Sequence, residues 1–246
     1  MSTDSNVRIA LITGAAKRVG REIALRLAKD GYDIAFTFLN SARDAASLVD
    51  EIKKHGRKCL AIRADLMEPV VGVEAVRTQL AGFSSRLNVL VNNASIYEPS
   101  SLGKTDVAQI RRFWAIHVEA PLLLCKVFAG QLRAARGHVV NMLDLLAERP
   151  WPEYLSYCTS KAGLWNLTLG LARELAPEVT VNGIAPGVVE WAKDMPESER
   201  EKYLKRVPLG RAGTPEDVAE AVSFLCGAGS YVTGQVIRLD GGRSLT

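Results

Sequence analysis

The sequence predicts an α/β protein: a single doubly wound Rossmann-type domain with a seven-stranded parallel sheet and helices on both faces. Seven short, almost continuously apolar runs are spread along its 246 residues, as expected for strands that are buried on both sides. Longer segments with helical periodicity separate these runs, and strand–helix alternation is typical of a parallel sheet. No proline- or serine-rich linker, low-complexity tract or internal repeat interrupts the pattern, so residues 1–246 are predicted to form one domain.

The seven predicted strands are residues 7–13, 32–38, 58–64, 87–93, 138–143, 179–185 and 235–240. Between them, the helical segments 21–31 and 41–56 end at glycine, as helices often do. Segment 214–227 begins with Thr214 as the predicted N-cap, followed by Pro215 at the first helical position. In such a sheet, ligands bind beyond the carboxyl ends of the strands, so function is expected in the loops that follow the apolar runs.

The composition is that of an ordinary soluble globule, with 48% hydrophobic and 24% charged residues. A net charge of +4 is small for a nucleic-acid binder, and no Lys/Arg-rich run stands out. No apolar stretch approaches the roughly 18 residues of a membrane span, and the chain start lacks signal-peptide features. The sequence therefore predicts a cytoplasmic protein without nucleic-acid or membrane partners. Its cysteines lack metal-ligand spacing, so we expect free thiols and no metal site.

The loop TGAAKRVG, after the first predicted strand, has features of a dinucleotide-binding turn. Gly14 permits the tight turn, and Gly20 lets the following helix pack closely on the strand. The helix N-terminus presents free N–H groups to a pyrophosphate, which makes Gly14, Lys17, Arg18 and Val19 candidate cofactor ligands. The spacing is not that of GxGxxG, and an ordinary strand–helix turn is the alternative.

The end of the second predicted strand favours NADPH over NADH. An NAD site commonly carries Asp or Glu there for the ribose hydroxyls, whereas a 2′-phosphate needs donors and cations. Residues 38–41 hold no carboxylate, while two bases lie in the glycine turn and Arg43 follows closely. We expect Asn40 and Ser41 to contact the cofactor. The alternative is that these bases are solvated surface groups.

The next two loops supply further candidate cofactor ligands. Asp65 and Leu66 follow the third predicted strand, where they would flank the adenine; a cap of the next helix is the alternative role for Asp65. Asn93, Ala94 and Ser95 end the fourth strand, where a cofactor would cross the sheet edge. Their small and amide side chains allow close backbone approach, and ordinary turn chemistry is the competing interpretation.

The strongest chemical signal lies in the stretch NMLDLLAERPWPEYLSYCTSK. Tyr157 and Lys161 are four residues apart and share a helix face, so the ammonium is predicted to lie beside the phenol. A nearby cation favours the phenolate and lowers the tyrosine pKa, which makes the phenol a usable proton donor or acceptor. Asp144 adds a carboxyl, although a strand-end residue without chemistry is the alternative. Together with the glycine turn, this cluster predicts a redox enzyme.

These motifs resemble the short-chain dehydrogenases/reductases over essentially the whole chain. The resemblance also includes residues 185–187 (APG), PLGRAGTPEDVAEAVSFL, TGQ and the closing Asp240-Gly-Gly. In detail the chain is similar to the pteridine and dihydromonapterin reductases, which carry TGAAKR with an arginine, NNAS, and Asp in place of the usual catalytic Ser. Arg18, Ser95 and Asp144 match these three features.

The resemblance implies further site residues and an assembly. Pro186, Gly187 and Val189 are expected to contact the cofactor, and residues of about 188–210 are expected to close over substrate as a lid. The Glu/Lys/Arg run in that segment also suits a solvated helix face. The family implies a homotetramer formed through the helix that contains Tyr157 and the helix that follows Thr214.

Asp144 favours an imine-like substrate over a ketone. In a ketone reductase a hydroxyl binds the carbonyl oxygen that becomes an alkoxide, and a carboxylate would repel that charge. Reduction of a pterin C=N bond requires hydride at carbon and a proton at nitrogen, which a carboxyl can help to deliver. The sequence therefore predicts NADPH-dependent reduction of a dihydropterin such as dihydromonapterin, dihydrobiopterin or dihydrofolate.

The resemblance also indicates how the pterin would be held. Tyr97 matches an aromatic position that stacks on the pterin, since a flat heterocycle fits between an aromatic ring and the nicotinamide. An ordinary half-buried tyrosine is the alternative. The planar guanidinium of Arg18 can bind pyrophosphate and substrate together. The predicted substrate contacts are Arg18, Ser95, Tyr97, Asp144, Tyr157 and Trp191.

One position departs from the family pattern. The segment FWAIHVEAP places His117 where most members have an Asn that holds a relay water. An imidazole with an ordinary pKa near 6.5 would make turnover sensitive to pH, whereas a satisfied core histidine is the alternative.

Two other functions compete. A carbonyl reductase, for example a 3-oxoacyl carrier-protein reductase, would be expected to have Ser at position 144. A non-catalytic NADP(H)-binding regulator would not need Tyr157 and Lys161.

Overall fold

The computed structural model describes residues 7–99, 101–191, 195–227 and 229–246. Seven parallel strands form one sheet in the order β3-β2-β1-β4-β5-β6-β7. They are β1 (Arg8–Ile12), β2 (Tyr32–Phe38), β3 (Cys59–Arg63), β4 (Val89–Asn92), β5 (His138–Met142), β6 (Thr180–Pro186) and β7 (Val236–Leu239). The doubly wound fold is confirmed, and each strand bound lies within two residues of its prediction.

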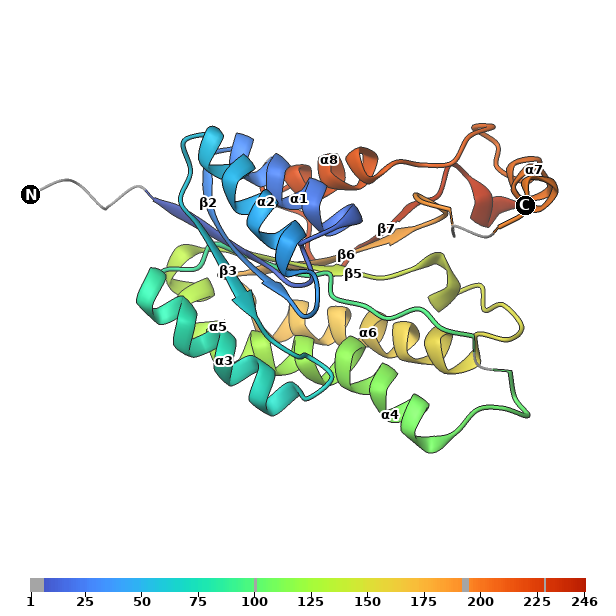
Figure 1. The fold of residues 1–246 in the computed structure, drawn as a ribbon, viewed down its shortest axis with the longest axis horizontal. Helices are drawn as coiled ribbons and strands as arrows, with labels where there is room; N and C mark the ends of the chain where they lie inside the picture. The colour runs from blue at the N-terminus through green and yellow to red at the C-terminus, as the bar shows by residue number, and fades with distance from the viewer. Residues whose placement is uncertain (1–6, 100, 192–194, 228) are drawn as a thin grey trace, which may run out of the picture.

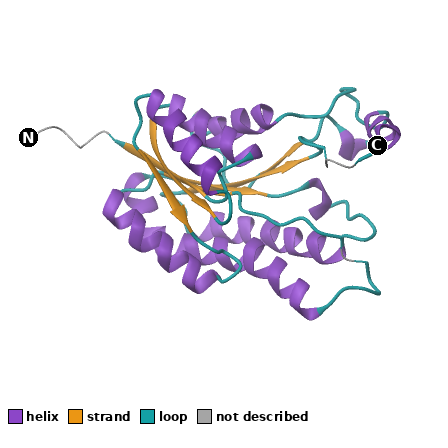
Figure 2. Cartoon of the chain, in the orientation of Figure 1, coloured by secondary structure: helices purple, strands orange, loops and turns teal. Residues whose placement is uncertain are grey.

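Helices cover both faces of the sheet (Figure 1; Figure 2). One layer contains α1 (Arg18–Lys29), α2 (Ala42–Lys54) and α8 (Pro215–Leu225). The other contains α3 (Pro69–Phe83), α4 (Val107–Trp114), η2 (Ala115–Glu119), α5 (Ala120–Ala135) and α6 (Leu155–Glu174). Three short elements, η3 (Leu145–Ala147), α7 (Glu197–Leu204) and η4 (Arg243–Leu245), complete the described chain. In Figure 1, α7 and the C-terminus lie together at one end of the sheet.

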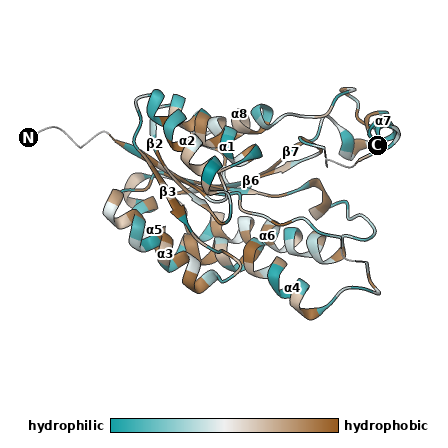
Figure 3. Ribbon diagram, viewed as in Figure 1, coloured by the Kyte–Doolittle hydropathy of each residue, from teal (hydrophilic) through white to brown (hydrophobic). Residues whose placement is uncertain are grey.

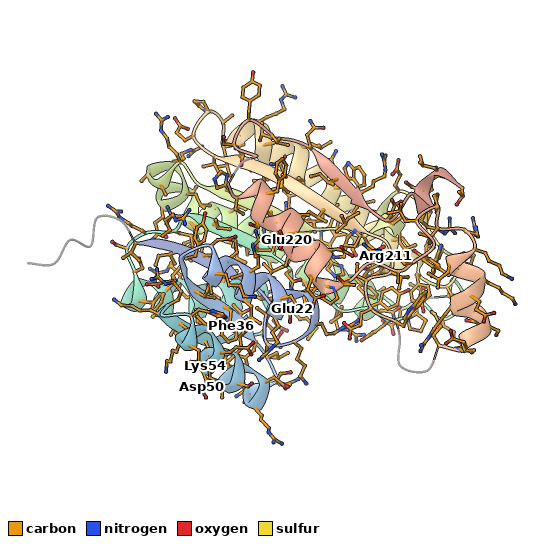
Figure 4. All side chains as sticks on the ribbon, turned by 90° about the horizontal axis from the view of Figure 1, so that it is seen from above. Glu22, Phe36, Asp50, Lys54, Arg211 and Glu220 are labelled. Atoms are coloured by element: carbon orange, nitrogen blue, oxygen red, sulfur yellow. The ribbon has the colours of Figure 1, made fainter. Side chains whose placement is uncertain are left out.

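The sheet forms the core because its strands are apolar on both sides. Apolar strand side chains pack against α1, α2 and α8 on one face and against α3, α5 and α6 on the other. Figure 3 shows brown, hydrophobic strands between helices whose outer faces carry teal residues. In Figure 4, Asp50 and Lys54 lie on α2, and both are exposed, whereas Phe36 of β2 is fully buried.

Two local predictions can be compared directly with the structure. Thr214 caps α8 in a capping box, in which its side chain accepts from Asp217 N and the Asp217 side chain accepts from Thr214 N. The helical stretch Val107–Ala135 has the length and composition of a membrane span, which corrects the expectation that no stretch does. Half of its most apolar part is buried, however, and Leu124 and Phe128 pack in the core beneath the sheet.

Candidate active site

A cavity of about 1130 Å³ lies beyond the carboxyl ends of the strands. It begins at the glycine turn after β1, passes the ends of β4, β5 and β6, and reaches α7 and η4. The sheet order reverses between β1 and β4, so the helices that follow these strands diverge and open a crevice there. Its volume exceeds the roughly 300–1,000 Å³ of a typical single-ligand pocket, which leaves room for a cofactor and a substrate.

The glycine turn requires glycine at both predicted positions. Gly14 has a φ of +66°, and a Cβ there would lie 2.9 Å from Cα of Ala94. A Cβ on Gly20 would lie 2.5 Å from Nδ2 of Asn93. Thr37 of β2 fixes the turn by accepting a 2.9 Å hydrogen bond from Gly14 N. The N-terminus of α1 therefore faces the cavity at close range, as an anion site requires.

Arg18 adopts a conformation that is unfavourable for a non-glycine residue. Its φ is +57°, and the left-handed region costs an ordinary residue about 1–2 kcal/mol. Its Nε lies 2.5 Å from Oε2 of Glu190, and Lys17 Nζ lies 3.0 Å from Oδ2 of Asp44. Both bases line the cavity. Each is thus held by a carboxylate where the sequence suggested a free cation.

The exit of β2 only partly matches its prediction. Phe38 and Leu39 line the cavity, whereas Asn40 and Ser41 are not among its lining residues. Ser41 instead occupies the N-cap position of α2 without a side-chain hydrogen bond. Arg63, which the sequence did not single out, donates from Nε to the carbonyl of Leu39 at 3.3 Å and adds a base beside this corner.

Three of the loop residues have identifiable structural roles. Asp65 accepts from Met67 N at 2.9 Å through Oδ1, but the N-cap of α3 is Glu68, so Asp65 does not cap that helix. Asn93 donates from Nδ2 to the carbonyls of Thr13 and Gly14. Both Asn93 N and Ala94 N donate to Thr13 Oγ1 at 2.9 Å. The β4 loop thus holds the glycine turn in place and also lines the cavity.

Asp144 and Tyr157 meet in the middle of the cavity. Tyr157 Oη donates to Oδ2 of Asp144 at 2.7 Å, and Oδ1 of Asp144 accepts from Leu146 N at 2.8 Å. Asp144 is the N-cap of η3 directly after β5, while Tyr157 is in the first turn of α6. Burial raises the pKa of the Asp144 carboxyl, although both hydrogen bonds oppose that shift.

Lys161 does not lower the pKa of Tyr157 in this structure, which corrects the expectation from the helical spacing. Its Nζ donates to the carbonyl of Met142 at 2.8 Å and lies 5.8 Å from the centre of the Tyr157 ring. Burial, followed by the charge of Asp144, raises the pKa of Tyr157 well above its ordinary value. Burial also lowers the pKa of Lys161 to about 8. Burial and the carboxyl of Asp144 together therefore outweigh any effect of the ammonium on the Tyr157 pKa.

His117 belongs to a buried hydrogen-bond chain. Its Nδ1 lies 2.8 Å from Ser160 Oγ, and its Nε2 lies 2.8 Å from Ser95 Oγ. Ser160 Oγ also donates to the carbonyl of Tyr157 at 2.7 Å. Because that bond uses the only hydroxyl proton of Ser160, His117 donates to Ser160 through Nδ1. Ser95 Oγ lies within reach of both His117 Nε2 and, at 3.3 Å, the carbonyl of Ile96. Burial favours the neutral ring, whose proton is then on Nδ1.

The ordinary pKa expected for His117 is wrong. Burial lowers its pKa well below 6.5, and the charge of Lys161 lowers it further. The imidazole is a satisfied core group, which was the alternative interpretation, but one of its partners, Ser95, lines the cavity.

An aromatic cluster forms the wall beside Tyr157. Tyr97 stacks on Tyr154 with ring centres 4.6 Å apart and an interplanar angle of 13°. It meets Tyr157 edge to face, with centres 4.8 Å apart. Tyr97 is 49% exposed, so it is half buried and has one face occupied by Tyr154.

The outer end of the cavity brings the predicted Trp191 together with residues that the sequence did not single out. Tyr203 of α7 contacts Trp151 and Trp191 edge to face, with ring centres 6.3 and 5.6 Å away. Arg243 lies 5.4 Å from the centre of the Tyr203 ring, and Arg149 also lines this end. In the sequence, Arg149 and Trp151 are marked only by the bulky, charged segment RPW, and Arg243 only by the segment GGRS.

The cofactor residues expected after β6 all line the cavity. These are Pro186, Gly187 and Val189, and Trp191 lies with them. Within the expected lid of about 188–210, residues 192–194 lie outside the described residues. The rest includes α7, none of whose residues is buried.

Comparisons with known proteins agree on the kind of protein. The family whose sequence profile matches residues 14–244 is described as Enoyl-(Acyl carrier protein) reductase. The chain is 33% identical over 242 residues to a 3-oxoacyl-[acyl-carrier-protein] reductase of Staphylococcus epidermidis, covering 95% of this chain and 97% of that protein. It is 32% identical over 287 residues to pteridine reductase 1 of Leishmania tarentolae, covering 100% and 99%.

Solved structures of dehydrogenases superimpose on this chain over nearly its whole length. An acetoin dehydrogenase from Enterobacter cloacae superimposes with a TM-score of 0.89 at 30% identity, covering 98% of this chain and 97% of that chain. A Serratia marcescens short-chain dehydrogenase/reductase superimposes with a TM-score of 0.89 at 30% identity, covering 96% and 98%. The curated relatives act on different substrates at nearly equal identity, so these comparisons do not single out one substrate.

Proposed function

This chain belongs to the short-chain dehydrogenase/reductase family, whose members are oxidoreductases that use NAD(P)H, and we propose that it is an NADPH-dependent pterin reductase. The reaction converts a dihydropterin to a tetrahydropterin. The single observation that carries the proposal is the 2.7 Å hydrogen bond between Tyr157 Oη and Asp144 Oδ2.

Asp144 suits a ring nitrogen better than a carbonyl oxygen. A reduced carbonyl becomes an alkoxide, and a carboxylate beside it would raise the energy of the transition state. A C=N bond instead ends as a neutral N–H. Burial raises the pKa of Asp144, which increases the protonated fraction of the carboxyl and lets it donate or share a proton with Tyr157.

Reduction of the C=N bond needs a hydride and a proton, and two groups of this site, Tyr157 and Asp144, can supply the proton. The cofactor, when bound, supplies a hydride to the carbon of the C=N bond. Tyr157 or Asp144 supplies the proton to the nitrogen, and solvent returns a proton to the pair. The ammonium of Lys161 compensates the negative charge that remains on the pair between these two events.

The residues present fit a dinucleotide. Gly14 and Gly20 leave no room for a Cβ, so the backbone and the α1 N-terminus are free to approach a pyrophosphate. Asp65 and Leu66 would flank the adenine, and Asn93 and Ala94 the central part. Pro186, Gly187, Val189 and Lys161 would contact the nicotinamide end. Lys17 and Arg18, which line the cavity, would exchange their carboxylate partners for the 2′-phosphate, which favours NADPH. Asn40 and Ser41 follow the lining residues Phe38 and Leu39 and are further proposed contacts.

The pterin would lie between the nicotinamide and the aromatic wall. We assign contacts to Tyr97, Ser95, Arg18 and Trp191, in addition to the catalytic pair. The hydroxyl of Ser95 lies 2.8 Å from His117 Nε2, and its oxygen would accept from a pterin N–H. Residues of about 188–210 would close over the bound substrate.

The assembly that we propose is a cytoplasmic homotetramer. The outer faces of α4 and α6 expose apolar side chains, including Ile110, Trp114 and Leu155 at 45%, 41% and 48%. Phe224 on α8 is 48% exposed. Apolar groups of this size on helix faces are typical of subunit interfaces.

A substrate panel tests the proposal. NADPH oxidation is followed at its near-ultraviolet absorbance with a dihydropterin, an acetoacetyl thioester, or no substrate. Turnover of the dihydropterin alone supports the proposal. Turnover of the thioester alone favours the second candidate, a 3-oxoacyl carrier-protein reductase, which the 33% identical relative supports. Cofactor binding without turnover of either would indicate a regulator.

A further inference from the structure

Three arginines converge at the outer end of the cavity, beyond the aromatic cluster. Arg149 follows η3, Arg206 follows α7, and Arg243 begins η4. Arg149 Nη2 donates to the carbonyl of Ser244 at 2.7 Å, which ties the loop after β5 to the C-terminal segment. Arg206 and Arg243 both donate to the backbone oxygen of Thr246, at 3.5 and 3.2 Å. The three guanidiniums thus lie around one short segment.

No Asp or Glu side chain of the described residues pairs with these three guanidiniums. The nearest carboxylate along the chain, that of Glu148, is held by Arg238 through two 2.7 Å hydrogen bonds. Glu199 of α7 is the other carboxylate at this end of the cavity. Among the side chains that line this end of the cavity, three arginines therefore face one acidic side chain that no arginine holds, that of Glu199.

Arg243 gives the second, independent observation. It is only 8% exposed, yet its buried Nε has no hydrogen-bond partner. A charged donor that is buried without a partner is costly. Its planar fork presents donors suited to a carboxylate or phosphate, and it lines the cavity that contains Tyr157.

We propose that Arg149, Arg206 and Arg243 form a binding site for an anionic group at the end of the substrate's side chain. The substrate class is a reducible head that binds at Asp144 and Tyr157, joined to a tail that ends in a carboxylate or a phosphate. The tail passes the aromatic cluster of Trp151, Trp191 and Tyr203. This inference rests on the proposed function for the identity of the head.

Steady-state kinetics with three dihydropterins tests the site. Their tails are a neutral methyl group, the glutamate of dihydrofolate, and a phosphate ester. We expect Arg243→Gln and Arg206→Gln to lower kcat/KM by about tenfold or more for the anionic substrates, through KM, and by less than about twofold for the methyl compound. Whichever anionic substrate loses more identifies the natural source of the charge.

The matched control is Arg211→Gln. Arg211 pairs with Asp217 at 2.7 Å, lies outside the cavity lining and is labelled in Figure 4. It should leave all three substrates unchanged. Arg206 is exposed, so its variant remains informative if Arg243→Gln fails to fold. Equal losses on all three substrates would mean that the arginines only hold the C-terminal segment, and would overturn the proposal.

A probe without a head separates this inference from the proposed function. Calorimetric binding of p-aminobenzoylglutamate to the NADPH-loaded protein should weaken by about tenfold in Arg243→Gln and stay unchanged in Arg211→Gln. If no dihydropterin is reduced but this binding is seen, the proposed function fails and the anion site stands. If the unmodified protein reduces dihydropterins but neither binds the probe nor prefers anionic tails, the anion site fails alone.

Discussion

Replacing Asp144 by serine removes the carboxyl from the acid–base pair while keeping a side chain that can cap η3. The serine Oγ would occupy roughly the place of the Asp144 Cγ, so the oxygen retreats from Tyr157 by about one C=O length, ~1.2 Å. The present 2.7 Å contact would then exceed normal hydrogen-bond range. Leu146 N keeps an acceptor, because serine is a favoured N-cap.

The expected consequence is a selective loss of turnover. Removing one positioned acid–base group lowers kcat on a dihydropterin by about a hundredfold. The lost hydrogen bond to a charged group costs about 1.5–3 kcal/mol, but the burial that raises the pKa of Asp144 is relieved. The free energy of unfolding should therefore change by less than ~2 kcal/mol.

The assay combines initial rates with NADPH titration and chemical denaturation. Asp144→Asn is the matched variant, since it keeps the size of the side chain and removes its titrating proton, and it should lose activity to a similar extent. NADPH affinity should remain within about twofold in both variants, because the carboxyl faces the substrate. Full dihydropterin activity in Asp144→Ser, or good reduction of ketones by the unmodified enzyme, would refute the reasoning.

Four further outcomes are expected. Tyr157→Phe should lower kcat by about a hundredfold or more with NADPH binding nearly intact; a near-normal rate in single-turnover measurements would exclude the tyrosine as the proton donor. Arg18→Gly should raise the free energy of unfolding by about 0.5–1 kcal/mol, because glycine tolerates a positive φ. The same variant should lower the affinity for NADPH more than that for NADH; equal losses in fluorescence titrations would limit the role of Arg18 to the pyrophosphate. Burial lowers the pKa of Lys161 to about 8 from an ordinary 10.5, so its charge is complete well below pH 8 and is lost as the pH rises through that value. NADPH affinity should fall over the same pH range, and Lys161→Met should remove this pH dependence. Because the pKa of His117 is well below 6.5, a pH–rate profile should show no inflection near 6.5, and an inflection that disappears in His117→Asn would contradict the neutral assignment.

The fold was predictable because its signals are local. Apolar runs mark strands that are buried on both faces, and Thr214 with Asp217 marks the start of α8 within four residues of sequence. The same holds for the glycine turn, since Gly14 needs its positive φ whatever lies around it. Spacing on a helix also brought Tyr157 and Lys161 to one site, together with Asp144 from the end of β5.

What the sequence left open depends on burial and on partners from distant segments. Burial and the charge of Asp144 raise the pKa of Tyr157, and the carbonyl of Met142 binds the ammonium of Lys161. Neither effect can be read from an i, i+4 spacing. Burial lowers the pKa of His117, and Ser95 and Ser160 from distant segments contact its two ring nitrogens.

The amino-acid sequence was sufficient to predict the layered α/β fold, the glycine turn and the residue types of the proposed catalytic pair. The distribution of charge around them became visible in the folded chain, because pairing and desolvation arise when the chain closes. Arg149 meets the carbonyl of Ser244 across 95 positions of sequence, and Arg243 is buried beside Tyr203. No local pattern carries such contacts, since their energy depends on the distance and the dielectric between groups that only the folded chain brings together.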